Sequence, residues 1–143
     1  MQSYDLIMQT FVPYPDIRDS ATSLDRRRLG KQRVETLQIL NCILGGKKGW
    51  SNHPAVRMWR NNPAGLSAYG VAVCAAWINL GYADTCTEKI SSLVAPDETD
   101  LPDWWGDERV HSSHRSNLLR KDVAFYSSYG WSDDPGAPYY WPS

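Results

Sequence analysis

The stretch "PAGLSAYGVAVCAAWINLG", residues 63–81, decides the fold class. Its apolar side chains recur at the i, i+3, i+4 and i+7 spacing that defines one side of an α-helix. Pro63, which follows Asn62, is favoured at a helix start, and Gly81 is a suitable stop. We therefore expect a central core helix, whose buried side carries Leu66, Tyr69, Gly70, Val73, Trp77 and Leu80.

Helix signals continue on both sides of this segment. Residues 20–46 predict a first long helix, with Thr22 or Ser23 as its N-cap and Gly45-Gly46 as its stop. A short helix is expected after Pro54, with Asn52 or Ser51 as its cap. Another is expected at 85–94, where Thr85 and Glu88 form a capping box, and a last one at 108–121.

Three segments lack a helical period. Residues 8–19 hold two prolines and suit an irregular lead-in, 95–108 form an acidic loop suited to a flap, and 131–143 form an aromatic, proline-rich tail. No alternating run predicts a strand. The sequence therefore predicts a mainly α protein, with residues 1–143 in a single compact helical domain.

Composition limits the function classes. Lys and Arg number 15 against 16 Asp and Glu, so any cationic site must be local, whereas a duplex-binding protein usually has a basic surplus. Three Cys form no CxxC pair, which predicts a reduced compartment without disulfides or a thiolate zinc site. No leader or membrane-spanning run is evident, and we expect a cytoplasmic protein without a membrane partner.

Cations nevertheless gather in "LDRRRLGKQRVE", residues 24–35. Arg26 and Arg27 fit a solvated helix face as well as a ligand site. Arg33 heads a leucine stripe and must find an acceptor, which is either an internal carboxylate, Glu35 or Asp25, or the phosphate of a ligand.

A second cluster, "HSSHRSNLLRKD", occupies residues 111–122. Two His at i and i+3 can ligate a metal, but no third ligand of suitable spacing is present, so we expect no metal. The alternatives are a helix whose His side chains cap neighbours or face water, and an anion site. A third cluster, "GWSNHPAVRMWR" at 49–60, mixes stacking rings with phosphate donors.

A phosphate-bearing, base-bearing ligand is the simplest shared explanation of three such clusters in a neutral chain. Its phosphates would meet Arg and Lys, while a Trp on the acidic loop would cover the base. The candidate ligand-binding residues are Arg28, Lys31, Gln32, Arg33, His53, Arg57, Trp104, Trp105, His111, His114, Arg115 and Lys121.

The motifs "MQTFVPYPD", "LDRRRLGKQRVE", "NHPAVRMWR" and "HSSHRSNLLRKD", in this order, resemble small phage and bacterial proteins grouped with the pyrimidine-dimer DNA glycosylases of the endonuclease V type. The resemblance implies a compact helical protein without metal or organic cofactor. It also implies an N-terminal amine nucleophile, a Glu near the sugar, and basic residues on phosphates.

Carried onto this chain, the resemblance makes Glu35 the candidate catalytic acid. Arg28 and Arg33 then match the helix-borne phosphate ligands, and Arg115 with Lys121 matches the late basic pair. The family pattern would start at Met8. Residues 1–7 are then either an N-terminal extension that displaces the amine, or they precede a start of translation at Met8.

The neutral charge and the displaced terminus favour a nucleotide-binding protein on a glycosylase-like fold. Such a protein would bind and sequester a nucleotide, for example a cyclic or ADP-ribose-type immune signal in a phage setting. The alternative is a DNA glycosylase and lyase that acts on damaged or modified bases. A homodimer is compatible with either function.

Overall fold

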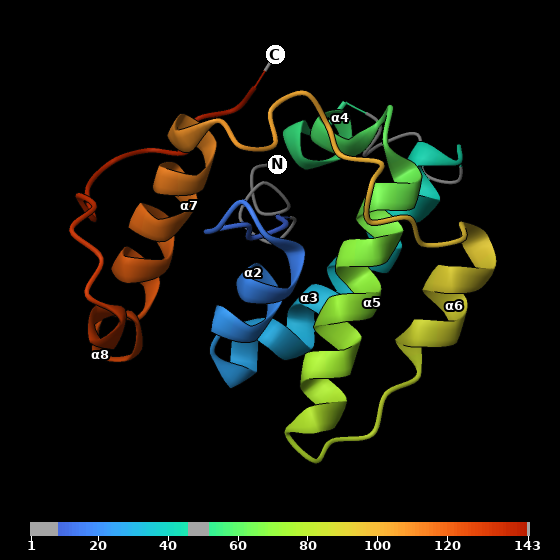
Figure 1. Ribbon diagram of the computed structural model, residues 1–143, viewed down its shortest axis with the longest axis horizontal. Helices are drawn as coiled ribbons and strands as arrows, with labels where there is room; N and C mark the ends of the chain where they lie inside the picture. Colours follow the sequence, from blue (N-terminus) through green and yellow to red (C-terminus); the bar gives the residue numbers. More distant parts are fainter. Residues whose placement is uncertain (1–8, 46–51, 143) are drawn as a thin grey trace.

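The computed structural model describes residues 9–45 and 52–142, and within these ranges it is helical without strands (Figure 1). The mainly α prediction is confirmed. The expected extension at 1–7 and the helix signals at Gly46 and Ser51 lie outside the described residues. The elements are α2 (Ile17–Ser23), α3 (Arg26–Ile43), α4 (Pro54–Trp59), α5 (Pro63–Asn79), α6 (Cys86–Leu93), α7 (Glu108–Lys121), α8 (Val123–Tyr126) and the 3-10 helix η2 (Ser127–Tyr129).

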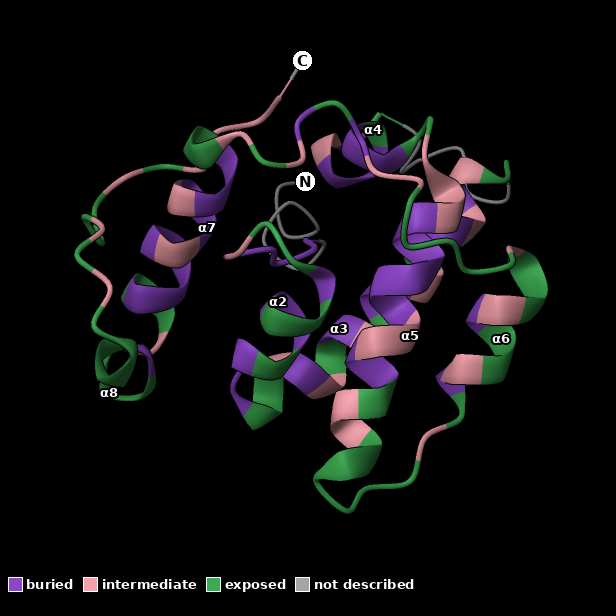
Figure 2. Ribbon diagram, viewed as in Figure 1, coloured by how far each residue is buried: buried purple, intermediate pink, exposed green. Residues whose placement is uncertain are grey.

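Helix α5 is central, and it packs against α2, α3 and α6 (Figure 1). Leu66, Tyr69 and Val73 are fully buried, as the apolar period predicts. The burial ends before the helix does, because its last turns extend beyond the neighbouring helices (Figure 2). Trp77 is only partly buried and Leu80 is 56% exposed, so the prediction that both belong to the core was wrong.

Gly70 allows three helices to meet closely. A Cβ at this position would lie 2.5 Å from Cγ2 of Thr36 on α3 and 3.1 Å from Cδ1 of Ile90 on α6. The first distance is shorter than real carbon contacts allow, so α5 approaches α3 as closely as it does only because residue 70 lacks a side chain.

The expected first long helix is divided in two. Helix α2 ends at Ser23, and α3 begins after Asp25, whose carboxylate accepts a hydrogen bond from the Arg28 backbone N–H at 3.4 Å. The N-cap is therefore Asp25, and the assignment to Thr22 or Ser23 was wrong. The predicted stop is confirmed, because Gly45 follows α3 with a φ of 96°, which an L side chain rarely adopts.

Two other caps differ from the predicted ones. His53 caps α4, and its Nδ1 accepts from the backbone N–H of Ala55 at 3.0 Å, in place of Asn52. Thr85 stands at the start of α6 but its side chain makes no cap bond. Asp84 supplies that bond instead, since its carboxylate accepts from the backbone N–H of Thr87 at 2.9 Å.

The irregular lead-in crosses the interior, between α7 and the other helices (Figure 1). Residues 9–13 are all buried, although their irregular backbone pairs with no strand within the described ranges. Side chains satisfy it instead. The backbone N–H of Phe11 donates to Oε1 of Gln32 at 2.8 Å, and its carbonyl accepts from the Tyr69 hydroxyl at 2.6 Å.

We expect Gly70→Ala to destabilise the protein by about 1–3 kcal/mol, because the added methyl group overpacks the junction of α3, α5 and α6. Chemical denaturation measures this change. Gln38→Ala, at an exposed position of α3, is the control and should change the free energy of unfolding by less than about 0.5 kcal/mol. Equal effects of the two substitutions would refute the close approach at Gly70.

Candidate functional site

A cavity of about 120 Å³ lies where α3, the end of α7 and the lead-in segment meet. Helix α3 contributes Arg27, Lys31 and Glu35, spaced four residues apart and therefore on one side of the helix. The complete lining is Gln9, Phe11, Arg27, Arg28, Lys31, Glu35 and Lys121. Four cationic side chains thus surround a single carboxyl group.

Glu35 is the only acidic residue among these lining side chains, and it is 8% exposed. Burial raises the pKa of Glu35 to about 7, since the carboxylate loses hydration. The positive charges of Lys31 and Lys121 act in the opposite direction without overcoming burial. Near neutral pH this carboxyl therefore exchanges protons readily, which is the property of a general acid or base.

The cations at the cavity are largely uncommitted. Arg28 pairs with Asp25 at 3.2 Å, whereas Arg27, Lys31 and Lys121 form no ion pair within the described ranges. Burial lowers the pKa of Lys121, and the neighbouring positive charges of Arg28 and Lys31 lower it further. Uncompensated positive charge of this kind attracts an anion.

Gln9 presents a free donor at the same place. The residue is 5% exposed, and its Oε1 accepts from the backbone N–H of Thr10 at 2.7 Å. Among residues 9–45 and 52–142 its Nε2 meets the geometry of a hydrogen bond with no acceptor, although the Gln9 side chain lies close enough to the Tyr139 phenol to act to lower the pKa of that phenol. A buried donor without an acceptor is costly, so this amide is suited to bind an oxygen of a ligand.

Gln32 does not line the cavity, but it forms hydrogen bonds with both the lead-in segment and Glu35. Its Nε2 donates to the Gln9 carbonyl at 2.5 Å and to Oε1 of Glu35 at 3.3 Å. The predicted ligand residue Gln32 thus lies beside the site, and its amide fixes both Gln9 and Glu35.

The predicted residues near the start of α7 hold the lead-in. Nδ1 of His111 donates to the Val12 carbonyl at 2.7 Å, and Nδ1 of His114 accepts from the Val12 N–H at 3.0 Å. Burial lowers the pKa of His114 to about 3, so its imidazole stays neutral. Arg115 donates to the Pro13 carbonyl at 2.7 Å and pairs with Asp133 at 2.9 Å. These three side chains are engaged inside the protein and lie outside the cavity lining.

Arg33, also on α3, does not line the cavity. It pairs with Asp84 at 2.5 Å, and its guanidinium lies 4.7 Å from the ring centre of Trp77. An internal carboxylate was one of the two predicted acceptors, but it is Asp84, and neither Glu35 nor Asp25. Burial acts to raise the pKa of Asp84, yet hydrogen bonds from Thr87 and Arg33 lower it, so the pair is ionic.

The four remaining predicted residues lie elsewhere. His53 is the buried cap of α4, and Arg57 is exposed on the same helix. Trp104 is 8% exposed and donates through Nε1 to the Met58 carbonyl at 2.9 Å. This part of the acidic loop is therefore packed against α4. Trp105 is partly buried, with its ring edge-on to His111 at 5.6 Å.

The cavity thus collects Arg28, Lys31, Glu35 and Lys121 from the predicted set, with Gln32 behind them. Sequence reasoning missed Gln9 and Phe11 as lining residues. Their motif was visible, but a polar side chain in an irregular segment has no period that reveals its direction. Arg27 was considered as a solvated residue, and the four-residue spacing to Lys31 and Glu35 was the available signal.

A larger and more open groove adjoins the cavity. It has a volume of about 560 Å³ and shares Arg27, Lys31 and Glu35 with the cavity, so these residues form a ridge between the two. Arg33, Val34 and Trp77 lie on its far side. The cavity and the groove therefore adjoin each other at Arg27, Lys31 and Glu35 of α3.

Metal and membrane signals are both lacking within residues 9–45 and 52–142. No three His, Cys, Asp or Glu side chains there are placed to hold a metal ion. No helix in this part of the chain combines the length and hydropathy needed to cross a bilayer. Cys42, Cys74 and Cys86 are buried, and none of the three forms a disulfide with another.

The raised pKa of Glu35 predicts a measurable pH dependence. The folded value of about 7 exceeds the ordinary 4.5, so the wild-type protein loses stability as pH rises from 4.5 through 7. Glu35→Gln cannot ionise. Above pH 7 this variant should be more stable than wild type by as much as about 3 kcal/mol, since one pKa unit corresponds to about 1.4 kcal/mol.

Denaturant unfolding at several pH values tests this expectation. Comparison at each pH cancels the contributions of His114 and the other titrating groups. Glu88→Gln, at an exposed position of α6, is the matched control and should show no such divergence. A constant difference between Glu35→Gln and wild type from pH 4.5 to 8 would contradict the assigned pKa.

One comparison with known proteins bears on this site. The family model described as pyrimidine dimer DNA glycosylase matches residues 8–89, more than half of the chain, and this range contains every cavity residue except Lys121. No curated protein and no solved structure matches the chain. The match over residues 8–89 shows that the chain belongs to the pyrimidine dimer DNA glycosylase family.

Proposed function

We propose that the protein is a DNA N-glycosylase that acts on damaged or modified bases, with Glu35 as its acid–base residue. The observation that carries the proposal is a buried carboxyl with a pKa of about 7 in a cavity walled by Arg27, Arg28, Lys31 and Lys121. The family membership supports the same reaction class.

The cationic wall suits the phosphates that flank a nucleotide in a DNA strand. Arg27 and Lys31 are exposed and form no ion pair with another residue of the described ranges, so they can bind phosphate without breaking such a pair. The net charge of −1 limits the number of such contacts, and binding should depend on salt less steeply than in a strongly basic protein.

The carboxyl suits cleavage of the bond between the base and C1′ of the sugar. As this bond breaks, the base leaves with the bonding electrons and takes up a proton, while water adds its oxygen to C1′ and loses a proton. Protonated Glu35 can supply the first proton, and ionised Glu35 can stabilise positive charge at the sugar or accept the second proton.

An amine can replace water as the nucleophile, as the family resemblance implies. The product is then an imine with the opened sugar, which borohydride reduces to a stable covalent link between protein and DNA. Trapping therefore distinguishes the two forms of the reaction, and base release detects either.

The volume of the cavity alone is too small for sequestration of a whole free nucleotide. A volume of about 120 Å³ is below the roughly 300 Å³ at which pockets for whole small-molecule ligands begin. The adjoining groove of about 560 Å³ does lie in that range, and nucleotide binding across both spaces remains the second candidate on this observation.

The experiment incubates the protein with oligonucleotides that carry pyrimidine dimers, oxidised bases or modified pyrimidines, and measures released bases by mass spectrometry. We expect release by the wild-type protein. Glu35→Gln should lower the rate by about 10²–10⁴-fold, because it removes the acid–base group, while DNA binding persists. Lys89→Ala, which removes an exposed cation of α6, should leave the rate unchanged.

Absence of base release and of borohydride trapping on every substrate would contradict the glycosylase proposal. Calorimetry with free nucleotides then tests the second candidate. Binding that is lost in Lys31→Ala but retained in Lys89→Ala would support sequestration at the same ridge.

A further inference from the structure

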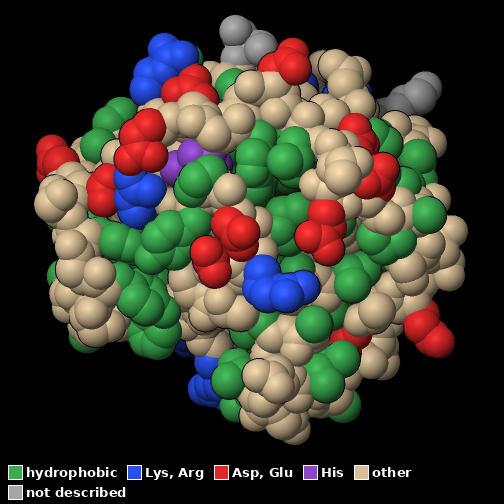
Figure 3. All heavy atoms as spheres, in the orientation of Figure 1, with side chains coloured by type: hydrophobic (Ala, Val, Ile, Leu, Met, Phe, Trp, Pro, Cys, Tyr) green, Lys and Arg blue, Asp and Glu red, His purple; other side chains and the backbone are tan. Residues whose placement is uncertain are grey.

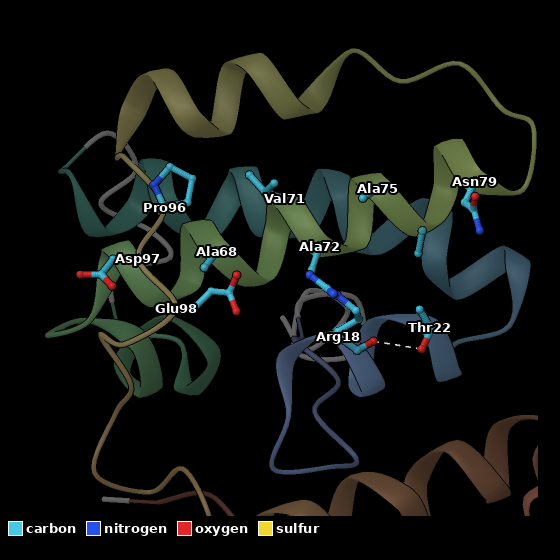
Figure 4. A pocket seen from close by; sticks show the side chains of 11 residues that line it. Arg18, Thr22, Ala68, Val71, Ala72, Ala75, Asn79, Pro96, Asp97 and Glu98 are labelled. Carbon is cyan, nitrogen blue, oxygen red and sulfur yellow. Dashed lines mark hydrogen bonds between the residues drawn. The ribbon is translucent and has the colours of Figure 1, made fainter.

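A groove of about 620 Å³ runs along α5 and shares no lining residue with the Glu35 cavity (Figure 4). Alanines of α5 form much of its lining, and Arg18, Asp97 and Glu98 carry the charges there. None of the described residues that line it is a lysine. The face that contains α5 mixes acidic, basic and hydrophobic side chains, and neither sign of charge dominates it (Figure 3). This groove is therefore larger than the cavity but offers no amine for chemistry.

The small Glu35 cavity, in contrast, is lined by two lysines, Lys31 on α3 and Lys121 at the end of α7. Lys31 also lines the adjoining open groove, where it can bind a phosphate. Lys121 lines the cavity and not that groove. The other cations of the cavity all come from α3, the helix that carries Glu35. Lys121 therefore approaches the carboxyl from a different element, with the cavity between the two helices.

The end of α7 fixes the position of Lys121 and leaves its amine available. Leu118 is fully buried and Leu119 is 5% exposed, so this turn of the helix is held against the core. Lys121 itself is exposed, and DNA can reach it. Its amine forms no ion pair with another residue of the described ranges. A positioned amine without an internal partner, beside an acid, is suited to form an imine with a sugar.

The surroundings of Lys121 favour the free amine, which is the nucleophilic form. Partial enclosure at the cavity lowers the pKa of Lys121. Three neighbouring cations lower it further: Arg28, Arg120 and Lys31. The negative charge of Glu35 acts to raise it, but Glu35 is largely protonated below pH 7. Arg120 is held in place by two backbone carbonyls of the aromatic tail, to which its guanidinium donates at 2.5 and 3.2 Å.

We propose that Lys121 is the amine nucleophile that attacks C1′ of the sugar, and that Glu35 is the acid beside it. Lys121 takes this role within the proposed glycosylase function, on which the inference rests. The family resemblance implies an N-terminal amine instead, so a nucleophile on the side chain of α7 would distinguish this chain from that pattern.

The reaction balances with these two groups. Nζ of Lys121 forms a bond to C1′, and the base leaves with the electron pair of its own bond to C1′ and takes a proton from Glu35. The ring oxygen then leaves C1′ with its bonding pair and is protonated, while the lone pair of Nζ forms the double bond of the imine. The two protons that Nζ loses replace those given to the base and the ring oxygen, so no oxidant or reductant is consumed.

Borohydride trapping on DNA that already contains an abasic site tests this role without requiring base release. The opened sugar at such a site carries an aldehyde at C1′, which an amine converts to an imine with loss of water. We expect the wild-type protein to be trapped, and peptide mapping by mass spectrometry to find the added sugar on Lys121. A link to Lys31 or to the N-terminal amine, or no link at all, would overturn the inference.

Lys121→Arg provides a second measurement, because a guanidinium keeps the positive charge but stays protonated and forms no imine. We expect the trapping rate to fall by about 10²-fold or more, while the Kd for the same DNA without borohydride changes by less than about threefold. Lys89→Arg, at an exposed position of α6, is the matched control and should be trapped at the wild-type rate. Circular dichroism checks that both variants are folded. Trapping of Lys121→Arg at the wild-type rate would also overturn the inference.

The outcomes separate the role of Lys121 from the proposed function. Base release without a link to Lys121 would leave the glycosylase proposal standing, with water or another amine as the nucleophile. A link to Lys121 on abasic DNA, without base release from any substrate, would support the nucleophile and contradict the glycosylase proposal.

Discussion

The structure depends on the burial of an irregular segment that pairs with no strand within the described ranges. The backbone of residues 9–13 is removed from water, and a buried peptide group without a partner costs roughly 1–3 kcal/mol. Side chains of α3, α5 and α7 provide the partners: Gln32, Tyr69, His111, His114 and Arg115. These bonds tie α7 to the other helices through the lead-in and so bring Lys121 to α3.

The same segment gives the candidate site its chemistry. Gln9 and Phe11 close one side of the cavity, and this enclosure removes water from Glu35. Burial raises the pKa of Glu35 and outweighs the charges of Lys31 and Lys121 and the backbone hydrogen bond from Gln9, which lower it. A group that is half protonated at neutral pH, beside uncommitted cations, is the feature on which the glycosylase proposal rests.

Local signals predicted the fold well where they were sufficient. The bounds of α7 agree with the predicted range, and an irregular lead-in is present. Its predicted end at residue 19 was wrong, because Asp16 caps α2 and the helix already begins at Ile17. The break between α2 and α3 was missed, because Thr22, Ser23 and Asp25 are all acceptable caps and only tertiary packing selects Asp25.

The candidate site was predicted in part for a related reason. The cationic motif at residues 24–35 made Lys31 a candidate and the family resemblance made Glu35 one, and the cavity includes both. The His and Arg of α7 were assigned to a ligand because their acceptors are not visible in the sequence. His114 binds the backbone of Val12, which lies 102 positions away along the chain. A peptide carbonyl and a phosphate oxygen attract the same donors, so composition alone cannot separate them.

Burial keeps Glu35 largely protonated below pH 7 in the folded protein. NMR titration of the Glu side-chain carboxyl carbons, with Glu35→Gln used to assign the resonance, measures this directly. We expect the Glu35 signal to titrate near pH 7, where ordinary glutamates are already ionised. A Glu35 signal that titrates at about 4.3, the value of an unperturbed Glu, would contradict it.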